Sequence, residues 1–285
     1  MTIAAPDEKR GAQDMTTAPD GAEQLAEHEV SRETASHGTH WSGMHGGYFS
    51  NPDVAAALLG PVEQAVRAAP PRVIADLGGG TGFILKEYLR RNPGAPAGLR
   101  LVNMDLSSEQ LEQVRDARIA THQASILEFH RQSLVAQDER LLCILRSATH
   151  YAGIFGLKPI LAHIRSQMLP GEYFVHQTAC YRQVEDALCL NVLYEAMGSQ
   201  KWFPCADVLV RLMEQAGFRV PETASAPPLP LESTTLKERY AVAPARMQAI
   251  REDLYRNFTA NDVLQFPGEG FTAFLHYRIF TCVAD

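Results

Sequence analysis

From residue 73 to residue 220 the chain alternates short apolar runs with amphipathic segments. Short apolar runs bounded by turn residues predict buried strands, and apolar residues repeated every three or four positions predict helices. Alternation of the two is typical of a parallel sheet wrapped by helices. We therefore predict an α/β fold with a mostly parallel sheet and helices on both faces.

The apolar runs and periodic segments locate the expected elements. Strands are predicted at residues 73–77, 101–104, 141–145, 173–176 and, closing the chain, 271–284. Helices are predicted from residue 51 to the prolines at 70–71, at 83–89, from Pro159 to residue 168, and at 184–197, 206–216 and 247–258. Ser107, followed three residues later by Gln110, resembles a helix cap.

The length of 285 residues suits one domain with additions. Residues 1–27 carry early charges and no apolar core, so we expect a disordered leader and no secretory signal. Residues 28–50 are rich in glycine, histidine and aromatic residues, which suits a lid over a pocket. Residues 51–285 then form the main domain, in which 221–270 are a Pro-rich, helical insertion on the substrate side.

Composition narrows the class of molecule that this protein is expected to bind. A net charge of -7 disfavours nucleic acid and anionic lipid, and no apolar run approaches the roughly 20 residues of a membrane helix. The five cysteines are scattered and form no CxxC pair, which indicates free thiols in a reducing compartment. We expect a cytoplasmic protein that binds a small molecule, and neither nucleic acid nor a membrane.

A glycine-rich turn, DLGGGTG, follows the first predicted strand at residues 76–82. The nicotinamide-type GxGxxG pattern fails because its third position is Phe83, and the phosphate-loop pattern fails for lack of a lysine. The spacing that fits is D-x-G-x-G-x-G, with Asp76 first. This pattern resembles the first motif of the class I S-adenosylmethionine-dependent methyltransferases.

The resemblance implies a Rossmann-like, seven-stranded sheet, S-adenosyl-L-methionine as cofactor, and methyl transfer to an oxygen, nitrogen or carbon of a small, natural-product-like acceptor. It implies that the cofactor contacts the turn and the strand ends that follow it. The residues concerned are Asp76, Gly78, Gly79, Gly80, Asp105, Leu106, Ser125 and Ile126. Asp105 takes the place of the family's acidic residue, whose carboxylate accepts from both ribose hydroxyls.

The remaining positions of this pattern include one departure from the family and two residues with alternative roles. Leu106 and Ile126 are expected beside the adenine, and Ser125 stands where the family often has a carboxylate. Arg146 either pairs with the carboxylate of the donor or merely ends its strand. Tyr48 is either the lid aromatic that touches the donor or a hydrophobic staple for the helix that follows it.

The family places methyl transfer just after its fourth strand, where this chain carries His150 and Tyr151. A histidine titrates near neutrality and can remove a proton from the acceptor, so we assign both residues as catalytic candidates. The alternative for His150 is a loop histidine that only shapes the pocket. Substrate-binding candidates are Trp41, His45, His176 and Trp202. For His176 and Trp202 the alternative is a core position.

The cluster His37, His40 and His45, with Glu33 nearby, raises the question of a metal. Its spacing matches no regular site, and residues 146–151 contain none of the carboxylates that metal-assisted relatives place there. We predict no metal.

Other functions stay open at this point. The nucleic-acid amine methyltransferases carry [DNS]PP[YFW] after the fourth strand, and RSAT at residues 146–149 does not match it. The alternatives are a donor-binding enzyme of the same fold that transfers no methyl group, and a non-catalytic binding or regulatory protein. The sequence does not distinguish a monomer from a homodimer, nor does it identify the acceptor.

Overall fold

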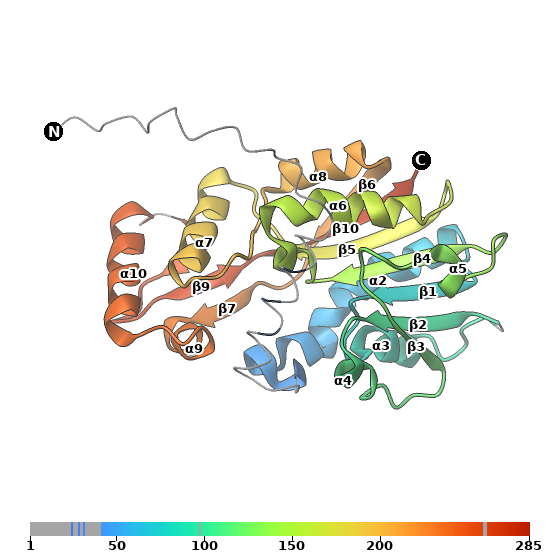
Figure 1. The fold of residues 1–285 in the computed structure, drawn as a ribbon, viewed down its shortest axis with the longest axis horizontal. Coiled ribbons are helices and arrows are strands. Elements are labelled where there is room, and N and C mark those ends of the chain that lie inside the picture. The colour runs from blue at the N-terminus through green and yellow to red at the C-terminus, as the bar shows by residue number, and fades with distance from the viewer. Residues whose placement is uncertain (1–23, 25–27, 29–30, 32–40, 97, 259–260) are drawn as a thin grey trace.

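A computed structural model describes residues 24, 28, 31, 41–96, 98–258 and 261–285. Its centre is a 7-stranded sheet in the order β3-β2-β1-β4-β5-β10-β6 (Figure 1). The strands are β1 (Val73–Leu77), β2 (Arg100–Asp105), β3 (Ile119–Gln123), β4 (Leu141–Arg146), β5 (Tyr173–Ala179), β6 (Phe218–Ser225) and β10 (Tyr277–Ala284). All neighbours from β3 to β5 are parallel, and only β10 runs antiparallel to its neighbours. The predicted seven-stranded, mostly parallel sheet is confirmed.

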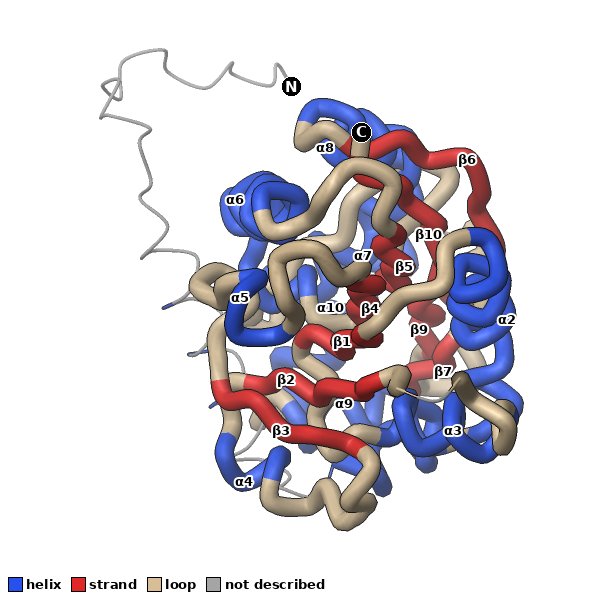
Figure 2. Tube along the Cα trace, turned by 90° about the vertical axis from the view of Figure 1, so that its right-hand side faces the viewer, coloured by secondary structure: helices blue, strands red, loops and turns tan. Residues whose placement is uncertain are grey.

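Helices cover both faces of this sheet (Figure 2). One face carries α2 (Pro52–Ala68) and α3 (Phe83–Arg91). The other carries α5 (Arg131–Leu134), α6 (Gly153–Ser166) and α8 (Ala206–Gln215). Because both faces are covered, every residue of β1 is buried.

Side-chain caps set two of the predicted helix starts. Asn51 accepts a hydrogen bond from the backbone N–H of Asp53 at the start of α2. Ser107 likewise accepts from Gln110 N at the start of the short α4 (Ser108–Leu111), which confirms the predicted cap. The helix expected to open at Pro159 instead begins at Gly153 and continues through the proline. Leu157 and Ile160 on either side of Pro159 are buried, so packing of the apolar face outweighs the lost backbone donor.

A second, 3-stranded sheet, in the order β7-β9-β8, lies beside the first (Figure 1). Its strands are β7 (Leu229–Glu232), β8 (Leu264–Gln265) and β9 (Thr272–Leu275), and its helices are α7 (Val184–Ala196), α9 (Ser233–Arg239) and α10 (Pro244–Asn257). We call these elements the cap. The region 221–270 is therefore only partly helical, and its first residues, 221–225, continue β6.

The run at 271–284, expected to be one strand of the main sheet, is two strands. β9 belongs to the cap and β10 to the main sheet, and His276 separates them. The run is mostly apolar because most residues of both strands are buried, so its hydropathy gives little sign of the change of sheet.

Most of the predictions for the amino-terminal region concern residues that the structure does not describe. Residues 1–27 and the first part of the predicted lid, with Glu33, His37 and His40, lie outside the described residues, except for 24, 28 and 31. The described part of the lid is a 3₁₀ segment, η1 (Trp41–Ser50). No helix among the described residues is long and apolar enough to cross a membrane.

A buried ion pair fastens the amino end of β4. Arg131 donates to Glu172 from Nη1 at 2.7 Å and from Nη2 at 2.9 Å. The carboxylate of Glu172 also accepts from the backbone N–H groups of Leu141 at 2.6 Å and Leu169 at 2.7 Å. The side chains of the pair are 10% and 2% exposed, so each charge depends on the other for compensation.

We expect Glu172→Ala to lower the free energy of unfolding by about 3–5 kcal/mol, because it leaves the Arg131 charge buried and uncompensated. The control is Arg118→Ala, which removes an exposed ion pair with Asp116 and should cost less than about 1 kcal/mol. Urea unfolding of the two variants measures both effects. Equal losses of unfolding free energy would show that the buried pair stabilises the protein no more than the exposed pair does.

Candidate functional site

The carboxyl ends of β1, β2 and β4 meet at one edge of the sheet, and the glycine turn lies there. Gly78, Gly80 and Gly82 have φ values of 68°, 55° and 72°, which side chains with a Cβ rarely adopt. A Cβ on Gly79 would lie 2.2 Å from Asn103 Oδ1 and 2.7 Å from Asp76 Oδ2. The turn therefore needs glycine, and it leaves bare backbone that a ligand can approach.

Asp105, at the end of β2, holds this turn in place. Its Oδ2 accepts from Gly80 N at 2.8 Å, and its Oδ1 accepts from Ser107 N at 2.9 Å. Burial raises the pKa of the carboxyl, although these backbone donors oppose the shift. A carboxylate keeps further lone pairs for donors such as ligand hydroxyls.

An apolar surface flanks the turn where β2 and β3 end. Leu106, directly after β2, is 43% exposed. Ile126 follows β3, and its Cδ1 would be 3.3 Å from a Cβ on Gly78. Ser125, two residues after the end of β3, is buried and accepts from Leu127 N at 3.2 Å. The two apolar side chains suit a flat ring, as predicted for adenine.

A row of buried polar side chains crosses the sheet beside the turn: Asn103, Asp76, Arg146 and Gln177. Asn103 and Asp76 are register partners on β2 and β1, and Arg146 and Gln177 on β4 and β5. Asn103, Asp76 and Gln177 are at most 1% exposed. Asn103 Nδ2 donates to Gly80 O at 2.8 Å, and Arg146 Nη1 donates to Phe49 O at 2.9 Å.

Other polar atoms of this row have no hydrogen-bond partner among the described residues. They are both carboxylate oxygens of Asp76, Oδ1 of Asn103, Nε and Nη2 of Arg146, and both amide atoms of Gln177. A buried polar atom without a partner costs about 1–3 kcal/mol, so such atoms are rarely gathered at one place. The row has the donors and acceptors of a binding site for a charged ligand.

Burial shifts the pKa values of the two charged groups in the row, Asp76 and Arg146. Burial raises the pKa of Asp76 to about 7, with a further upward push from Asp105 and an opposing effect of Arg146. Burial also lowers the pKa of Arg146, whose charge is partly supported by Tyr48, Tyr277 and Asp76. A ligand bearing both charges would relieve both groups, because each would gain an opposite partner.

The end of η1 contacts Arg146 of this row. Phe49 lies 5.2 Å from the Arg146 guanidinium, measured to the ring centroid. Tyr48 stacks on Tyr277 at 5.7 Å and donates its hydroxyl hydrogen to Pro227 O. Tyr48 thus joins η1 to β10 and to the segment between β6 and β7.

A second cluster lies just past β4, where His150 and Tyr151 form part of η2 (Thr149–Ala152). His150 is 6% exposed, and its ring lies 4.3 Å from that of Tyr151 and 5.5 Å from that of Phe203. Trp202 is half-buried and donates its backbone N–H to His150 O at 3.2 Å. The structure therefore brings three predicted residues, His150, Tyr151 and Trp202, together beside the sheet edge.

The other substrate candidates lie elsewhere or cannot be placed. His45, in η1, contacts Arg239 of the cap through its ring nitrogen. His176 is fully buried against Phe174, and burial lowers its pKa to about 3, so its ring is neutral. The side chain of Trp41 lies outside the described residues. Among the described residues, no group of three or more His, Cys, Asp or Glu is placed to hold a metal.

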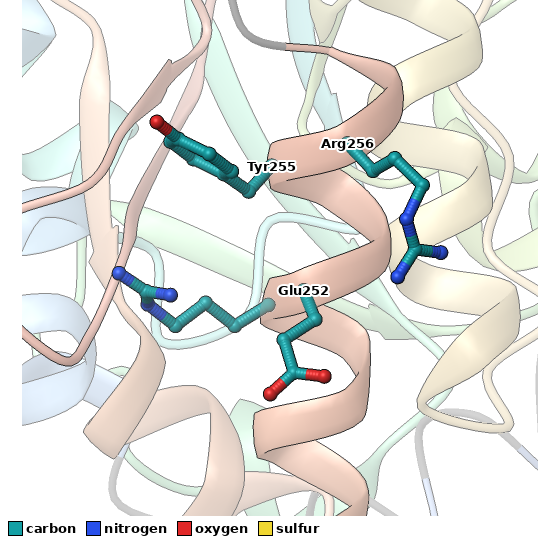
Figure 3. A pocket seen from close by; sticks show the side chains of 4 residues that line it. Glu252, Tyr255 and Arg256 are labelled. Atoms are coloured by element: carbon teal, nitrogen blue, oxygen red, sulfur yellow. The ribbon is translucent and has the colours of Figure 1, made fainter.

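A shallow depression on α10 lies on the cap (Figure 3). It is lined by Arg251, Glu252, Tyr255 and Arg256. All four belong to one helix, and none was predicted to bind or react. Arg251 is engaged with the backbone oxygens of Gly268 and Gly270, so the depression reflects packing of the cap and not the candidate site.

Sequence reasoning missed four residues of the site: Asn103, Gln177, Lys201 and Tyr240. Asn103 and Gln177 could have been recognised from the sequence, because each is a polar residue inside an apolar strand. Lys201 and Tyr240 could not, since they come from loop and helix ends that only the folded chain brings together. Lys201 Nζ donates to the hydroxyl of Tyr240 at 3.0 Å, and Lys201 is 5% exposed.

No protein-family model matches the chain, and no curated protein matches its sequence. Solved structures do match it in fold. A candidate methyltransferase from Bacillus halodurans C-125 has a TM-score of 0.61 at 14% identity, over 80% of this chain and 98% of that one. The YcgJ protein of Bacillus subtilis has a TM-score of 0.57 at 11% identity, over 79% and 98%.

Geranyl diphosphate C-methyltransferase from Streptomyces coelicolor A3(2) has a TM-score of 0.50 at 13% identity, over 81% of this chain and 79% of that one. These likenesses agree with the strand order, in which the last strand is antiparallel between β5 and β6. The chain has the class I S-adenosylmethionine-dependent methyltransferase fold.

The raised pKa of Asp76 has a consequence for stability. The folded protein holds the carboxyl proton of Asp76 more tightly than the unfolded chain does, so ionisation of Asp76 destabilises the fold. This destabilisation is absent below about pH 4 and grows as the pH rises to about 7. We expect Asp76→Asn to raise the free energy of unfolding by up to about 4 kcal/mol above pH 7 and to change it little at pH 4. Urea unfolding at the two pH values tests this. A difference that does not depend on pH would contradict it.

Proposed function

We propose that the protein is an S-adenosylmethionine-dependent methyltransferase that acts on a small organic acceptor. The observation that carries the proposal is the row of buried, unpartnered polar atoms on Asp76, Arg146 and Gln177 beside the bare glycine turn. A carboxylate and a guanidinium on neighbouring strands are complementary to the ammonium and carboxylate of an amino acid. The methionine end of the donor carries both charges.

Each part of the donor matches a different part of the edge. The donor ammonium is assigned to Asp76 and its carboxylate to Arg146, with the amide of Gln177 beside it. Asp105 receives the ribose hydroxyls, and Leu106 and Ile126 flank the adenine. The backbone of Gly78, Gly79 and Gly80 lies against the donor because the absence of side chains permits close approach.

The donor supplies a methyl group on a positively charged sulfur, which a nucleophile displaces in line. The protein has to align the acceptor, exclude water and accept a proton. His150 is assigned the last of these tasks, since it lies directly after β4 and is buried among aromatic rings. Tyr151 and Trp202 border the acceptor, and His45 approaches from the lid.

The solved neighbours support a small-molecule acceptor. The Streptomyces coelicolor enzyme is described in complex with geranyl diphosphate and S-adenosyl-L-homocysteine. The net charge of -7 agrees with a small-molecule partner more than with nucleic acid. All five cysteines are free thiols, which suits the proposed location in the cytoplasm.

Donor binding should depend on pH through Asp76. Its carboxyl has a pKa of about 7 and must ionise to pair with the donor ammonium. We expect the affinity for S-adenosylmethionine to rise about eightfold from pH 6 to pH 7.5, with release of about 0.9 proton on binding at pH 6. Isothermal titration calorimetry in buffers of different ionisation enthalpy measures both quantities.

The matched variant for that experiment is Asp76→Asn, which should bind at least tenfold more weakly at pH 7.5 and without proton release. Because this variant is expected to be the more stable one at pH 7.5, weak binding cannot be blamed on misfolding. Tight, pH-independent binding to the variant would remove Asp76 from the donor site.

We expect His150→Ala to lower turnover by about 10²–10⁴-fold, the usual contribution of a general base, while the affinity for S-adenosylmethionine changes less than twofold. Turnover is followed as S-adenosylhomocysteine release by mass spectrometry with a panel of phenolic and amine acceptors. His122→Ala is the control, since His122 lies on β3 away from the cluster. Turnover by His150→Ala equal to that of the unmodified protein at every pH would leave His150 without a role as base.

A further inference from the structure

Side chains of β2 fix the peptide groups of Gly80 from both sides. The N–H of Gly80 donates to Asp105 Oδ2 at 2.8 Å, and its carbonyl accepts from Asn103 Nδ2 at 2.8 Å. The N–H of Gly79 also donates to Met104 O at 3.0 Å. The middle of the glycine turn is therefore tied to three successive residues of β2.

Asn103 is used neither by the family pattern nor by the proposed donor site. Its side chain lies on the same face of β2 as that of Asp105, because residues two apart in a strand share a face. Asn103 is fully buried in a strand whose central residues are otherwise apolar. An amide in such surroundings costs free energy unless both of its polar atoms form hydrogen bonds.

The described residues satisfy only one of the two polar atoms of this amide. Asn103 Nδ2 donates to Gly80 O, whereas Asn103 Oδ1 has no hydrogen-bond partner among the described residues. The Gly80 carbonyl fixes the orientation of the amide, since the reversed amide would place two acceptors against each other. Asn103 Oδ1 is therefore a buried acceptor that a bound ligand can use.

Asn103 Oδ1 lies close to a carboxylate oxygen of Asp76. A Cβ on Gly79 would be 2.2 Å from Asn103 Oδ1 and 2.7 Å from Asp76 Oδ2, so both oxygens approach the same side of Gly79. Asn103 and Asp76 are register partners on neighbouring strands. Neither carboxylate oxygen of Asp76 has a partner among the described residues. Two buried acceptors thus converge at one place, where a hydrogen-bond donor from a ligand would satisfy both.

A primary ammonium group matches this pair of oxygens. It has three N–H donors, which can reach two acceptors at once, and its positive charge stabilises a buried carboxylate. A neutral hydroxyl has a single hydrogen and brings no charge. A hard cation such as Mg²⁺ needs an octahedral set of oxygen ligands, which one carboxylate and one amide oxygen do not provide.

We propose that Asn103 is a specificity-determining residue, whose Oδ1 accepts a hydrogen bond from the ammonium group of the methyl donor while its Nδ2 holds the Gly80 carbonyl. This inference rests on the proposed function, in which Asp76 alone receives that ammonium group. One side chain then serves both the shape of the glycine turn and recognition of the amino acid end of the ligand. Asn103 thereby favours adenosine derivatives that carry an ammonium group over those that lack one.

The test compares two ligands that differ in one group. S-adenosylhomocysteine carries the ammonium group, and its deamino analogue has hydrogen in that place. Isothermal titration calorimetry of the full-length protein at pH 7.5 gives the affinity for each ligand. We expect the unmodified protein to favour S-adenosylhomocysteine by at least about 100-fold, because the analogue loses hydrogen bonds from a charged group to two acceptors.

Asn103→Leu removes both polar atoms of the amide and nearly keeps the size of the side chain. We expect both ligands to bind more weakly, because the Gly80 carbonyl loses its hydrogen-bond donor. The preference for S-adenosylhomocysteine over its deamino analogue should fall in addition by about 10-fold, the effect of one hydrogen bond to a charged group. A merely structural role would weaken both ligands equally and leave that preference unchanged.

Asn103→Asp separates the two polar atoms of the amide. This variant keeps an acceptor oxygen but loses the N–H group that Gly80 O accepts from, so both ligands should weaken while the preference for S-adenosylhomocysteine does not fall. Thr121→Val is the matched control, since Thr121 is the exposed register partner of Asn103 on β3. It should change neither affinity.

The possible results assign failure to one proposal or the other. A preference below about 10-fold in the unmodified protein, or a full preference in Asn103→Leu, overturns the role of Asn103, while binding of S-adenosylhomocysteine leaves the proposed function intact. If Asn103→Leu does not fold, as judged by circular dichroism, a preference that falls in Asn103→Asp overturns the role and one that persists supports it. Absence of S-adenosylhomocysteine binding to the unmodified protein overturns the proposed function, and the role of Asn103 with it.

Discussion

The site depends on one electrostatic constraint, the carboxyl of Asp76 buried without a partner among the described residues. Its surroundings leave little freedom, since a Cβ on Gly79 would lie 2.7 Å from its Oδ2. The pKa of about 7 means that ionisation at neutral pH works against folding. A chain that keeps such a group at the sheet edge gives up stability where a cationic ligand can restore it, which is typical of functional sites.

The two halves of the proposed site differ in how their polar groups are satisfied. The donor half, around Asp76, Arg146 and Gln177, leaves buried atoms without partners among the described residues. The acceptor half places the ring of His150 against those of Tyr151 and Phe203. The donor half thus suits a ligand of fixed charge pattern, whereas the acceptor half offers mainly aromatic surface. This division suits one donor used with a specific acceptor.

The sequence predicted what depends on local pattern. Buried strands, the glycine turn, the cap at Ser107 and Asp105 at a strand end all leave periodic or positional signals within a few residues. Prediction from the sequence failed where contacts between residues far apart in the chain decide the structure. Pro159 lies inside α6 because tertiary packing outweighs its local cost, and the run at 271–284 divides at His276 between two sheets that are equally apolar. Lys201 and Tyr240 are 39 positions apart, and no local pattern links them.

The burial of the donor half also fixes what a ligand must displace. Asp76 and Gln177 are at most 1% exposed, so a ligand reaches them only if neighbouring groups move. The Phe49 carbonyl now accepts from Arg146 Nη1 at 2.9 Å, and a ligand carboxylate would compete for the same guanidinium. A charged acceptor forms the stronger hydrogen bond, so the exchange favours the ligand. Binding of the proposed donor carboxylate and release of the Phe49 carbonyl therefore depend on the same side chain, Arg146.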